Sequence, residues 1–286
     1  SRPIGFSVEP QSAGSHKNYI VSGNVIDFSG IASGTERGQT YGIALNIRPP
    51  SEAPAITEYV VQDLQIYGNV IRGVGWGIFC NRLRVGTATE GGSINVYGNM
   101  LTSCRQDGIL IGGCPDASYN DVCFISENIV RGYSEQSTNS RDGIVLSEYL
   151  AAPIITGNYI ARRIGESGAT NGRYAVNISS ANIVNASVEG NYVANAASGV
   201  VNNAGTSSTF SKNKGYLNEN GGTSAAISTG GTIAHGLAGT PTVFSVTPTG
   251  AATDVYVTAG ATNLTVTFGG GGSVAFAWRA SLANAM

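Results

Sequence analysis

The sequence predicts an all-β protein: a parallel β-helix over residues 1–222, then a small antiparallel, β-sandwich-like module over residues 223–286. Three observations predict it. A short motif around an asparagine recurs, apolar residues alternate around each copy, and this pattern stops near residue 222. The composition agrees, because 286 residues with 40 glycines and only 12% charged side chains disfavour helices, which lose stability at glycine and gain it from charged pairs.

A Gly-Asn motif recurs about every 30 residues through the first part of the chain. Its copies read VSGNVI, IYGNVI, VYGNML, ISENIV, ITGNYI, VEGNYV and, in degenerate form, FSKNKG; their asparagines are Asn24, Asn69, Asn99, Asn128, Asn158, Asn191 and Asn213. A sharp bend favours a residue that tolerates left-handed backbone geometry, and stacked amides can hydrogen-bond to one another. The asparagines therefore predict one bend repeated in about seven stacked coils.

Apolar columns flank each bend. Val or Ile stands three residues before each of the first six asparagines, and Ile, Leu or Val stands two residues after it. A second strand follows in each copy, and its two apolar columns are Ile43, Ile78, Ile109, Ile144, Val176 and Val200, then Leu45, Cys80, Ile111, Leu146 and Ile178. Alternation of period two predicts short strands that stack like side chains on like in a shared core.

The four cysteines predict buried free thiols and folding in a reducing cytoplasm. They are Cys80, Cys104, Cys114 and Cys123, too few for a disulfide scaffold and spaced unlike a zinc motif. The two histidines, His16 and His235, are interpreted as structural. No calcium-loop spacing of carboxylates and no phosphate-binding glycine loop occurs, so we expect neither a metal nor a cofactor.

Charge and hydropathy limit the partners. A net charge of −2 without a basic run predicts no nucleic-acid partner. No apolar run approaches the roughly 20 residues of a membrane span, so membrane insertion is not expected. The opening SRPIGFSVEP lacks a signal-peptide layout, and we expect it to lie inside a longer protein.

The last part of the chain has a different pattern. Alternating segments at 242–247, 254–259, 263–268 and 273–279 are separated by Gly, Pro and Thr turns, which predicts antiparallel strands. About 60 residues is little for independent stability. We therefore expect this module to cap the solenoid, to join copies of the chain as a trimerisation module, or to bind glycan.

Two features now support a resemblance. The stacked Gly-Asn and Gly-Ile coils resemble the pectate-lyase-type right-handed, single-stranded β-helix, and the segments HGLAGTPTVFSVTP and VAFAWRA resemble the C-terminal part of bacteriophage tailspike and tail-fibre depolymerases. The resemblance implies a homotrimer of parallel solenoids that binds a bacterial surface polysaccharide, either capsule or O-antigen, and cleaves it by hydrolysis or β-elimination. It also implies a place in the virion tail, reached through N-terminal coils or a head domain.

Aromatic and acidic residues precede the second strand of successive coils: Tyr41, Trp76, Asp107, Asp142, Tyr174 and Ser198. Neighbouring coils lie about 4.8 Å apart, so the two acids should lie side by side between aromatic rings. An aromatic face stacks on a sugar ring, and an acid next to it can protonate a glycosidic oxygen. Repulsion between the acids would raise the pKa of one, which would then serve as general acid.

These considerations define a candidate site. The expected catalytic residues are Asp107, Asp142 and, farther along the same coil, Glu148; the expected substrate-binding residues are Tyr41, Trp76, Arg105, Arg141 and Tyr174. The arginines would hold the carboxylate of an acidic sugar. Loop acids such as Glu135 or Glu166 are further candidates if the site lies between subunits.

Plainer interpretations stay open. Asp-Gly is a common turn dipeptide whose carboxylate can simply accept backbone N–H bonds. Strict alternation of inward and outward side chains would also place the column of Asp107 and Asp142 on the core face of the sheet. The column would face outward only if the turn before the strand changes this alternation. A non-catalytic glycan-binding adhesin or fibre segment, and a secreted bacterial polysaccharide lyase or epimerase, are the alternative functions for the same fold.

Overall fold

A computed structural model describes residues 4–8, 15–30, 40–45, 59–81, 83–84, 93–113, 122–135, 140–161, 172–194, 196–215, 219–237 and 240–281. These residues form a parallel β-solenoid followed by small antiparallel sheets, and no helix occurs among them. The predicted all-β class is therefore confirmed. The chain divides into two compact units, Ser1–Ser208 and Thr209–Met286.

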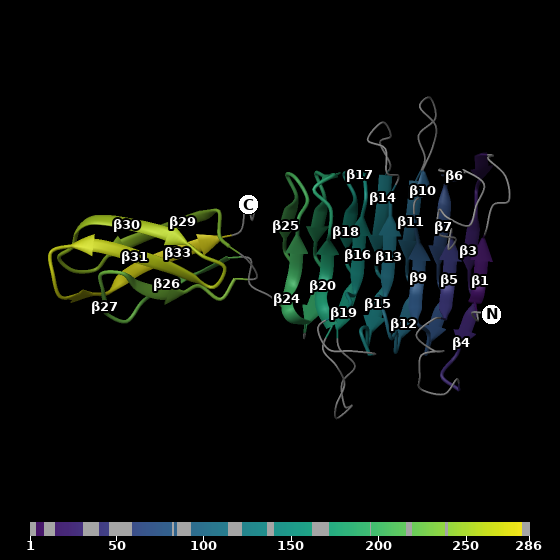
Figure 1. The fold of residues 1–286 in the computed structure, drawn as a ribbon, viewed down its shortest axis with the longest axis horizontal. Coiled ribbons are helices and arrows are strands. Elements are labelled where there is room, and N and C mark those ends of the chain that lie inside the picture. The colour runs from purple at the N-terminus through teal and green to yellow at the C-terminus, as the bar shows by residue number, and fades with distance from the viewer. Residues whose placement is uncertain are drawn as a thin grey trace. The chain divides into compact units, whose positions relative to one another are not determined.

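Three long parallel sheets, here called sheets A, C and D, make up most of the solenoid. Each takes one strand from each of several successive coils (Figure 1). Sheet A contains β1 (Ile4–Val8), β5 (Tyr41–Leu45), β9 (Trp76–Cys80), β13 (Ile109–Gly112), β16 (Ile144–Ser147), β20 (Gly172–Ile178) and β24 (Ala196–Asn203). Sheet C contains β3 (Ile20–Ser22), β7 (Leu64–Tyr67), β11 (Ser93–Tyr97), β14 (Val122–Ser126), β18 (Ile154–Thr156), β22 (Ser187–Glu189) and β25 (Thr209–Ser211). Sheet D contains β4 (Val25–Asp27), β8 (Val70–Arg72), β12 (Met100–Thr102), β15 (Ile129–Arg131), β19 (Tyr159–Ala161) and β23 (Tyr192–Ala194).

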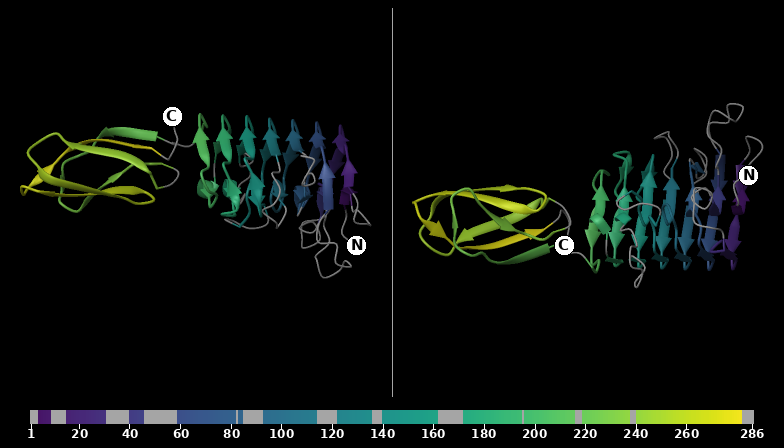
Figure 2. Two further views of the ribbon diagram at one scale, coloured as in Figure 1. Left: turned by 90° about the horizontal axis from the view of Figure 1, so that it is seen from above. Right: turned by 60° about the horizontal axis from the view of Figure 1, so that its bottom comes forward.

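Two smaller parallel sheets complete the coils. One is formed by β2 (Ser15–Lys17), β6 (Tyr59–Gln62) and β10 (Leu83–Arg84), and the other by β17 (Leu150–Ala151) and β21 (Ile183–Val184). Figure 2 shows from two further sides that equivalent strands of successive coils lie next to one another. Each coil therefore buries its apolar side only against the coils before and after it.

The core consists of the apolar columns that the sequence predicts. In sheet C, Ile66 pairs with Val96 and Val96 with Ile125, and all three side chains are fully buried. Cys80, Cys104 and Cys123 are free and buried, and burial with Cys123 nearby raises the pKa of the Cys80 thiol. The three cysteines thus pack as small apolar residues. Cys114 lies outside the described residues.

An asparagine ladder joins the coils at the bend between sheets C and D. The backbone N–H and the side-chain Nδ2 of Asn99 both donate to Oδ1 of Asn128, at 3.1 and 2.9 Å. Asn128 repeats both bonds to Asn158, each at 3.0 Å, and its Nδ2 also donates to the Val96 carbonyl at 2.8 Å. The same pattern links Asn24 to Asn69, Asn69 to Asn99, and Asn158 to Asn191.

The asparagine is not the left-handed residue of this bend, which corrects one expectation. The positive φ belongs to the residue before it, as at Gly98 with φ 61° and Gly157 with φ 64°. Glycine adopts this conformation without steric cost, which explains the Gly-Asn pair. Glu127 takes the same position with φ 55°, in the coil whose motif reads ISENIV.

The alignment of the last strand of sheet A was wrong by one residue. The sequence pattern aligns Val176 with Val200 and Tyr174 with Ser198, whereas in the structure Val176 pairs with Val201 and Tyr174 with Gly199. A register irregularity between Gly172 and Tyr174 causes the shift. Such a bulge adds one residue to one strand without changing its apolar pattern, so the pattern does not reveal it.

The second unit contains antiparallel strands in three sheets: β26 (Glu219–Thr223), β33 (Phe276–Ser281) and β29 (Val243–Pro248); β27 (Ile227–Ser228) and β32 (Ser273–Val274); and β28 (Gly231–Ala234), β31 (Asn263–Gly269) and β30 (Thr253–Ala259). Its core includes Leu264, Val266 and Phe276. The buried His235 accepts the Leu237 N–H at Nδ1, so Nε2 carries the proton that it shares with the Gly260 carbonyl. This geometry agrees with a structural role.

The ladder predicts a position-dependent effect of substitution. We expect Asn128→Ala to lower the free energy of unfolding by about 3 kcal/mol, because it removes the amide and leaves buried partners on both neighbouring coils unpaired. Asn24→Ala, at a partly buried side chain, should cost about 1 kcal/mol. Urea unfolding followed by circular dichroism measures both values, and equal losses would contradict the central role of the ladder.

Candidate functional site on the outer face of sheet A

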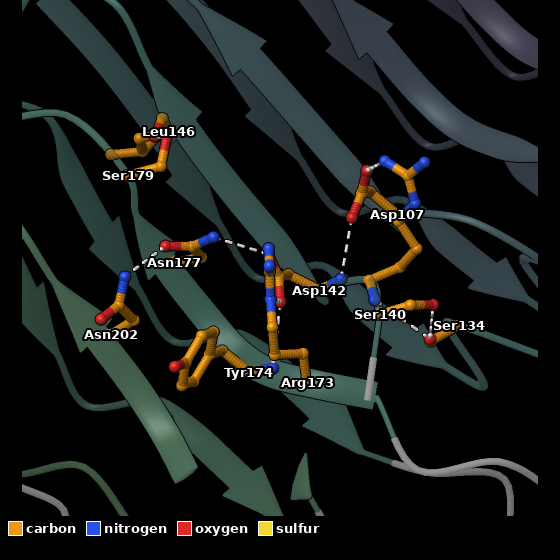
Figure 3. Close-up of polar contacts among 11 residues, drawn as sticks. Asp107, Ser134, Ser140, Asp142, Leu146, Arg173, Tyr174, Asn177, Ser179 and Asn202 are labelled. Carbon is orange, nitrogen blue, oxygen red and sulfur yellow. Dashed lines mark hydrogen bonds and ion pairs between the residues drawn. The ribbon is translucent and has the colours of Figure 1, made fainter. Parts of the chain in front are cut away.

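A glycine turns the acidic column away from the core. Gly108 follows Asp107, and a Cβ atom there would lie 2.5 Å from Cγ1 of Val130 and 2.6 Å from the Gly143 carbonyl oxygen. Gly108 therefore faces inward, and so does the buried Ile109 after it. Two consecutive inward residues reset the alternation, so Asp107 and the equivalent Asp142 lie on the outer face of sheet A (Figure 3).

Asp142 is fully buried and accepts four hydrogen bonds. Nε and Nη2 of Arg173 donate to its two oxygens at 3.0 and 2.7 Å, which makes the ion pair bidentate. The Tyr174 N–H donates to Oδ1 at 3.0 Å, and Asn177 Nδ2 donates to Oδ2 at 2.6 Å. Both oxygens thus carry two donors each, and this carboxyl group positions the residues around it.

Asp107 has fewer partners. Its Oδ1 accepts the Asp142 N–H at 2.8 Å, and its Oδ2 lies 3.6 Å from Nη1 of Arg141. Only 3% of Asp107 is exposed, and the contact with Arg141 at 3.6 Å compensates its burial only in part. Burial raises the pKa of Asp107 to about 6; the Asp142 N–H and Arg141 oppose this rise, and the Asp142 charge adds to it.

The two arginines lie on adjacent coils, where the Arg173 N–H donates to the Arg141 carbonyl at 2.7 Å. Their side chains are 44% exposed for Arg141 and 39% for Arg173, so each can still meet solvent. The Arg173 guanidinium lies 5.4 Å from the centroid of the Tyr174 ring, and hydrogen bonding to Asp142 raises the Arg173 pKa. The cluster therefore pairs each acid with a partly exposed cation.

Aromatic rings occupy the same face on the two coils before Asp107. Tyr41 stacks on Trp76 with ring centroids 4.8 Å apart and an interplanar angle of 10°. Phe79 contacts both rings edge-on. Strand register places Trp76 beside Asp107, since Ile78 pairs with Ile109 two residues later in each strand. Tyr41 is buried, whereas Trp76 is half-exposed.

Glu148 and Arg105, two of the expected site residues, occupy different positions relative to the two acids. Glu148 follows β16 whereas Asp142 precedes it, so the two are separated along the strand by roughly 15–20 Å. Arg105 is half-buried on the coil of Asp107. Among the loop acids, Glu135 is half-buried, and Glu166 lies outside the described residues.

The structure adds three polar residues that the sequence analysis missed. Arg173 and Asn177 bind Asp142, and Asn202 Nδ2 donates to Oδ1 of Asn177 at 2.9 Å, which extends the network to β24 (Figure 3). The alternation of side chains along the strand could have identified Asn177 from the sequence. Asn177 stands between the core residues Val176 and Ile178 and must therefore face outward. Arg173 could also have been identified from the sequence. It directly precedes Tyr174 as Arg141 directly precedes Asp142, so the aligned copies place the two arginines in one column.

Tyr133 is a further buried polar group near the cluster. Its ring occupies the space where a Gly172 side chain would lie, and its hydroxyl has no hydrogen-bond partner among the residues that the structure describes. Burial, and then the charge of Asp142, raise the pKa of this hydroxyl. A group of three His, Cys, Asp or Glu side chains suited to a metal ion is absent from the described part of the chain.

Comparison of the chain with protein-family models, curated proteins and solved structures finds no match. Among the residues that the structure describes, no helix has the length and apolar character needed to cross a membrane.

The raised pKa of Asp107 predicts a measurable pH effect. Its pKa is about 6 in the fold and about 3.9 in an unfolded chain, so the folded state holds the proton more tightly. Its ionisation thus destabilises the fold as the pH rises from about 4 to 6, by ~3 kcal/mol at pH 7. We expect Asp107→Asn to stabilise the protein at pH 7 and not at pH 4, as measured by urea unfolding at both values. Identical pH profiles for the native chain and the variant would contradict this assignment.

Proposed function

We propose that this chain is part of a phage tailspike-type receptor-binding protein that binds a bacterial surface polysaccharide and depolymerises it on the outer face of sheet A. One observation carries the proposal: a carboxyl group with a pKa of about 6, Asp107, lies one coil from Trp76, whose ring stacks on Tyr41 of the coil before. Sugar rings stack on aromatic faces, and a neutral carboxyl group is the proton donor that glycosidic cleavage requires.

Binding would use groups on several coils. The half-exposed ring of Trp76 would take the apolar face of one sugar, and Tyr174 that of another beyond the acids. The exposed parts of Arg141 and Arg173 would donate to hydroxyl or carboxylate groups between them. Because the coils repeat about every 4.8 Å, a glycan chain lying along the solenoid would meet these groups in succession.

Cleavage would begin at Asp107. Near pH 6 this carboxyl group is protonated in part of the molecules and can donate its proton to the leaving glycosidic oxygen. A water molecule would supply the hydroxyl group that replaces this oxygen at the anomeric carbon, and the remaining proton of the water would go to the solvent. Asp142 would act on Asp107 indirectly, through its backbone N–H and by fixing Arg173. The virion tail and a homotrimer are the proposed setting of this activity.

A second function, glycan binding without cleavage, is favoured by one observation. Both oxygens of Asp142 are fully occupied and Asp107 is 3% exposed, so neither acid is freely accessible to a sugar. In that case the acids would only hold the two arginines and the strand ends in place, and the exposed rings would bind the glycan.

Cleavage depends on Asp107 in this proposal. With a capsule or O-antigen that the native chain degrades, we expect Asp107→Asn to reduce release of reducing ends or unsaturated sugars at least about 100-fold, with glycan affinity unchanged. Asp63→Asn, an exposed acid in a turn before sheet C, is the matched control. Full activity of the Asp107 variant would exclude this role, and binding by the native chain without any product would favour the second function.

Affinity depends on Trp76. Its replacement in Trp76→Ala should weaken glycan binding about tenfold, equal to ~1.4 kcal/mol, because a sugar loses its stacking partner. Tyr97→Ala removes a ring that is likewise stacked, on Tyr67 of sheet C, and should leave the affinity unchanged. Isothermal titration calorimetry with oligosaccharides measures both, and equal effects would place the binding surface elsewhere.

A further inference from the structure

The last coil of sheet A carries no charged side chain. Residues 190–208, which contain β23 and β24, include no Asp, Glu, Lys, Arg or His. The two coils before it are different, because Arg141 and Asp142 lie on one of them and Arg173 on the next. The outer face of sheet A therefore changes from charged to uncharged between β20 and β24, which are paired strands.

The side-chain amide of Asn202, on β24, has a fixed orientation. Asp142 forms a bidentate ion pair with Arg173, and a carboxylate only accepts hydrogen bonds, so Asn177 directs its Nδ2 to Asp142. Oδ1 of Asn177 is then left to accept Nδ2 of Asn202 (Figure 3). The Asn202 side chain is half-exposed, and its Oδ1 accepts no hydrogen bond within the described part of the chain. Asn202 thus presents an acceptor of fixed direction.

The Tyr174 ring has a glycine as its neighbour on the last coil. Strand register pairs Tyr174 with Gly199, whereas at the other end of the same column Tyr41 pairs with Trp76 and stacks on it. Because Gly199 has no side chain, this neighbour leaves the β24 side of the Tyr174 ring uncovered. The guanidinium of Arg173 lies 5.4 Å from the ring centroid. The half-exposed ring can therefore take a sugar on the side of β24.

We infer that Tyr174, Asn202 and the space beside Gly199 form a subsite for an uncharged sugar unit of an acidic polysaccharide. It rests on the proposed function and adds the class of substrate. The sugar would stack on Tyr174 and donate a hydroxyl or amide hydrogen to Oδ1 of Asn202.

A carboxylate-bearing sugar suits the coils before this subsite better than the subsite itself. A carboxylate has no hydrogen to donate to Oδ1 of Asn202, and the last coil supplies no cation. The partly exposed Arg141 and Arg173 supply cations on the two preceding coils. Coils repeat about every 4.8 Å, so neighbouring units of one glycan would meet the arginines and then Asn202. The expected substrate is a capsule or O-antigen in which an acidic unit adjoins an uncharged one.

A glycan array tests this substrate class. Purified bacterial capsules and O-antigens of known composition are immobilised and probed with the full chain. We expect the strongest binding to glycans in which an acidic unit adjoins an uncharged unit. Equal or stronger binding to glycans made entirely of uronic acids, or to glycans without any acidic unit, would overturn the inference and leave the proposed function standing. Binding to none of them would contradict both.

Gly199→Tyr tests the space beside Tyr174, with isothermal titration calorimetry on a glycan that the array identifies. It should weaken binding at least about tenfold by filling the subsite. The midpoint of thermal unfolding should stay unchanged or rise, because the new ring can stack on Tyr174. Ser126→Tyr is the matched control: it adds a ring beside Tyr97 on the outer face of sheet C and should leave the affinity unchanged.

Asn202→Leu removes the fixed acceptor and should also weaken binding, by about fivefold or more. If this variant does not fold, because Asn177 loses its donor, Gly199→Tyr alone decides. Unchanged affinity in the folded subsite variants, while Trp76→Ala still weakens binding, would overturn the subsite and not the proposed function. Equal losses in Gly199→Tyr and Ser126→Tyr would overturn it as well.

Discussion

Every feature of the solenoid depends on the register in which one coil stacks on the next. The asparagine ladder enforces it, because each side-chain amide bonds to the amide of the next coil and to a carbonyl of the coil before. A slip of one residue would break these bonds and turn the buried columns of sheets C and D toward water. The apolar columns supply most of the driving force for stacking, but alone they would also permit neighbouring registers. The ladder therefore contributes specificity as well as stability.

The acidic cluster uses this fixed register. Asp107 and Asp142 lie on adjacent coils because Ile109 pairs with Ile144, and their outward direction depends on glycines at positions where a Cβ would meet the core. Backbone and side-chain donors then arrive from the following coil at set distances. Although the coil spacing is the same, the two acids receive different partners from the following coil. Asp142 receives a bidentate arginine, whereas Asp107 receives one backbone donor and a more distant cation, so its burial is compensated only in part.

Much of the fold was predictable from the sequence, because stacking makes neighbouring coils repeat their residue types. The buried columns at Ile66 and Val96, the buried Cys80 and Cys123, and the position of Asp107 next to Asp142 on adjacent coils follow from this repetition. The outward direction of the two acids depends on the inward glycine after each of them, which the alternation alone does not reveal. The bulge before Tyr174 does not, since an extra residue leaves an apolar pattern intact and only shifts its alignment. Nor was the partner of Asp142 predictable. Arg141 directly precedes Asp142, and Arg173 directly precedes Tyr174 in the same column. The side-chain positions in the structure are needed to show that Arg173 forms the bidentate pair with Asp142.

The ladder also gives the solenoid an electrostatic direction. In every step the side-chain carbonyl accepts from the coil before it, so the carbonyl dipoles from Asn69 to Asn191 point the same way along the axis. Aligned hydrogen-bonded amides polarise one another, and each added coil strengthens those already formed. The two ends of the row differ in sign, as the ends of an α-helix do. A stack of coils is therefore polar in the electrostatic sense, and adding a coil at one end is not equivalent to adding it at the other.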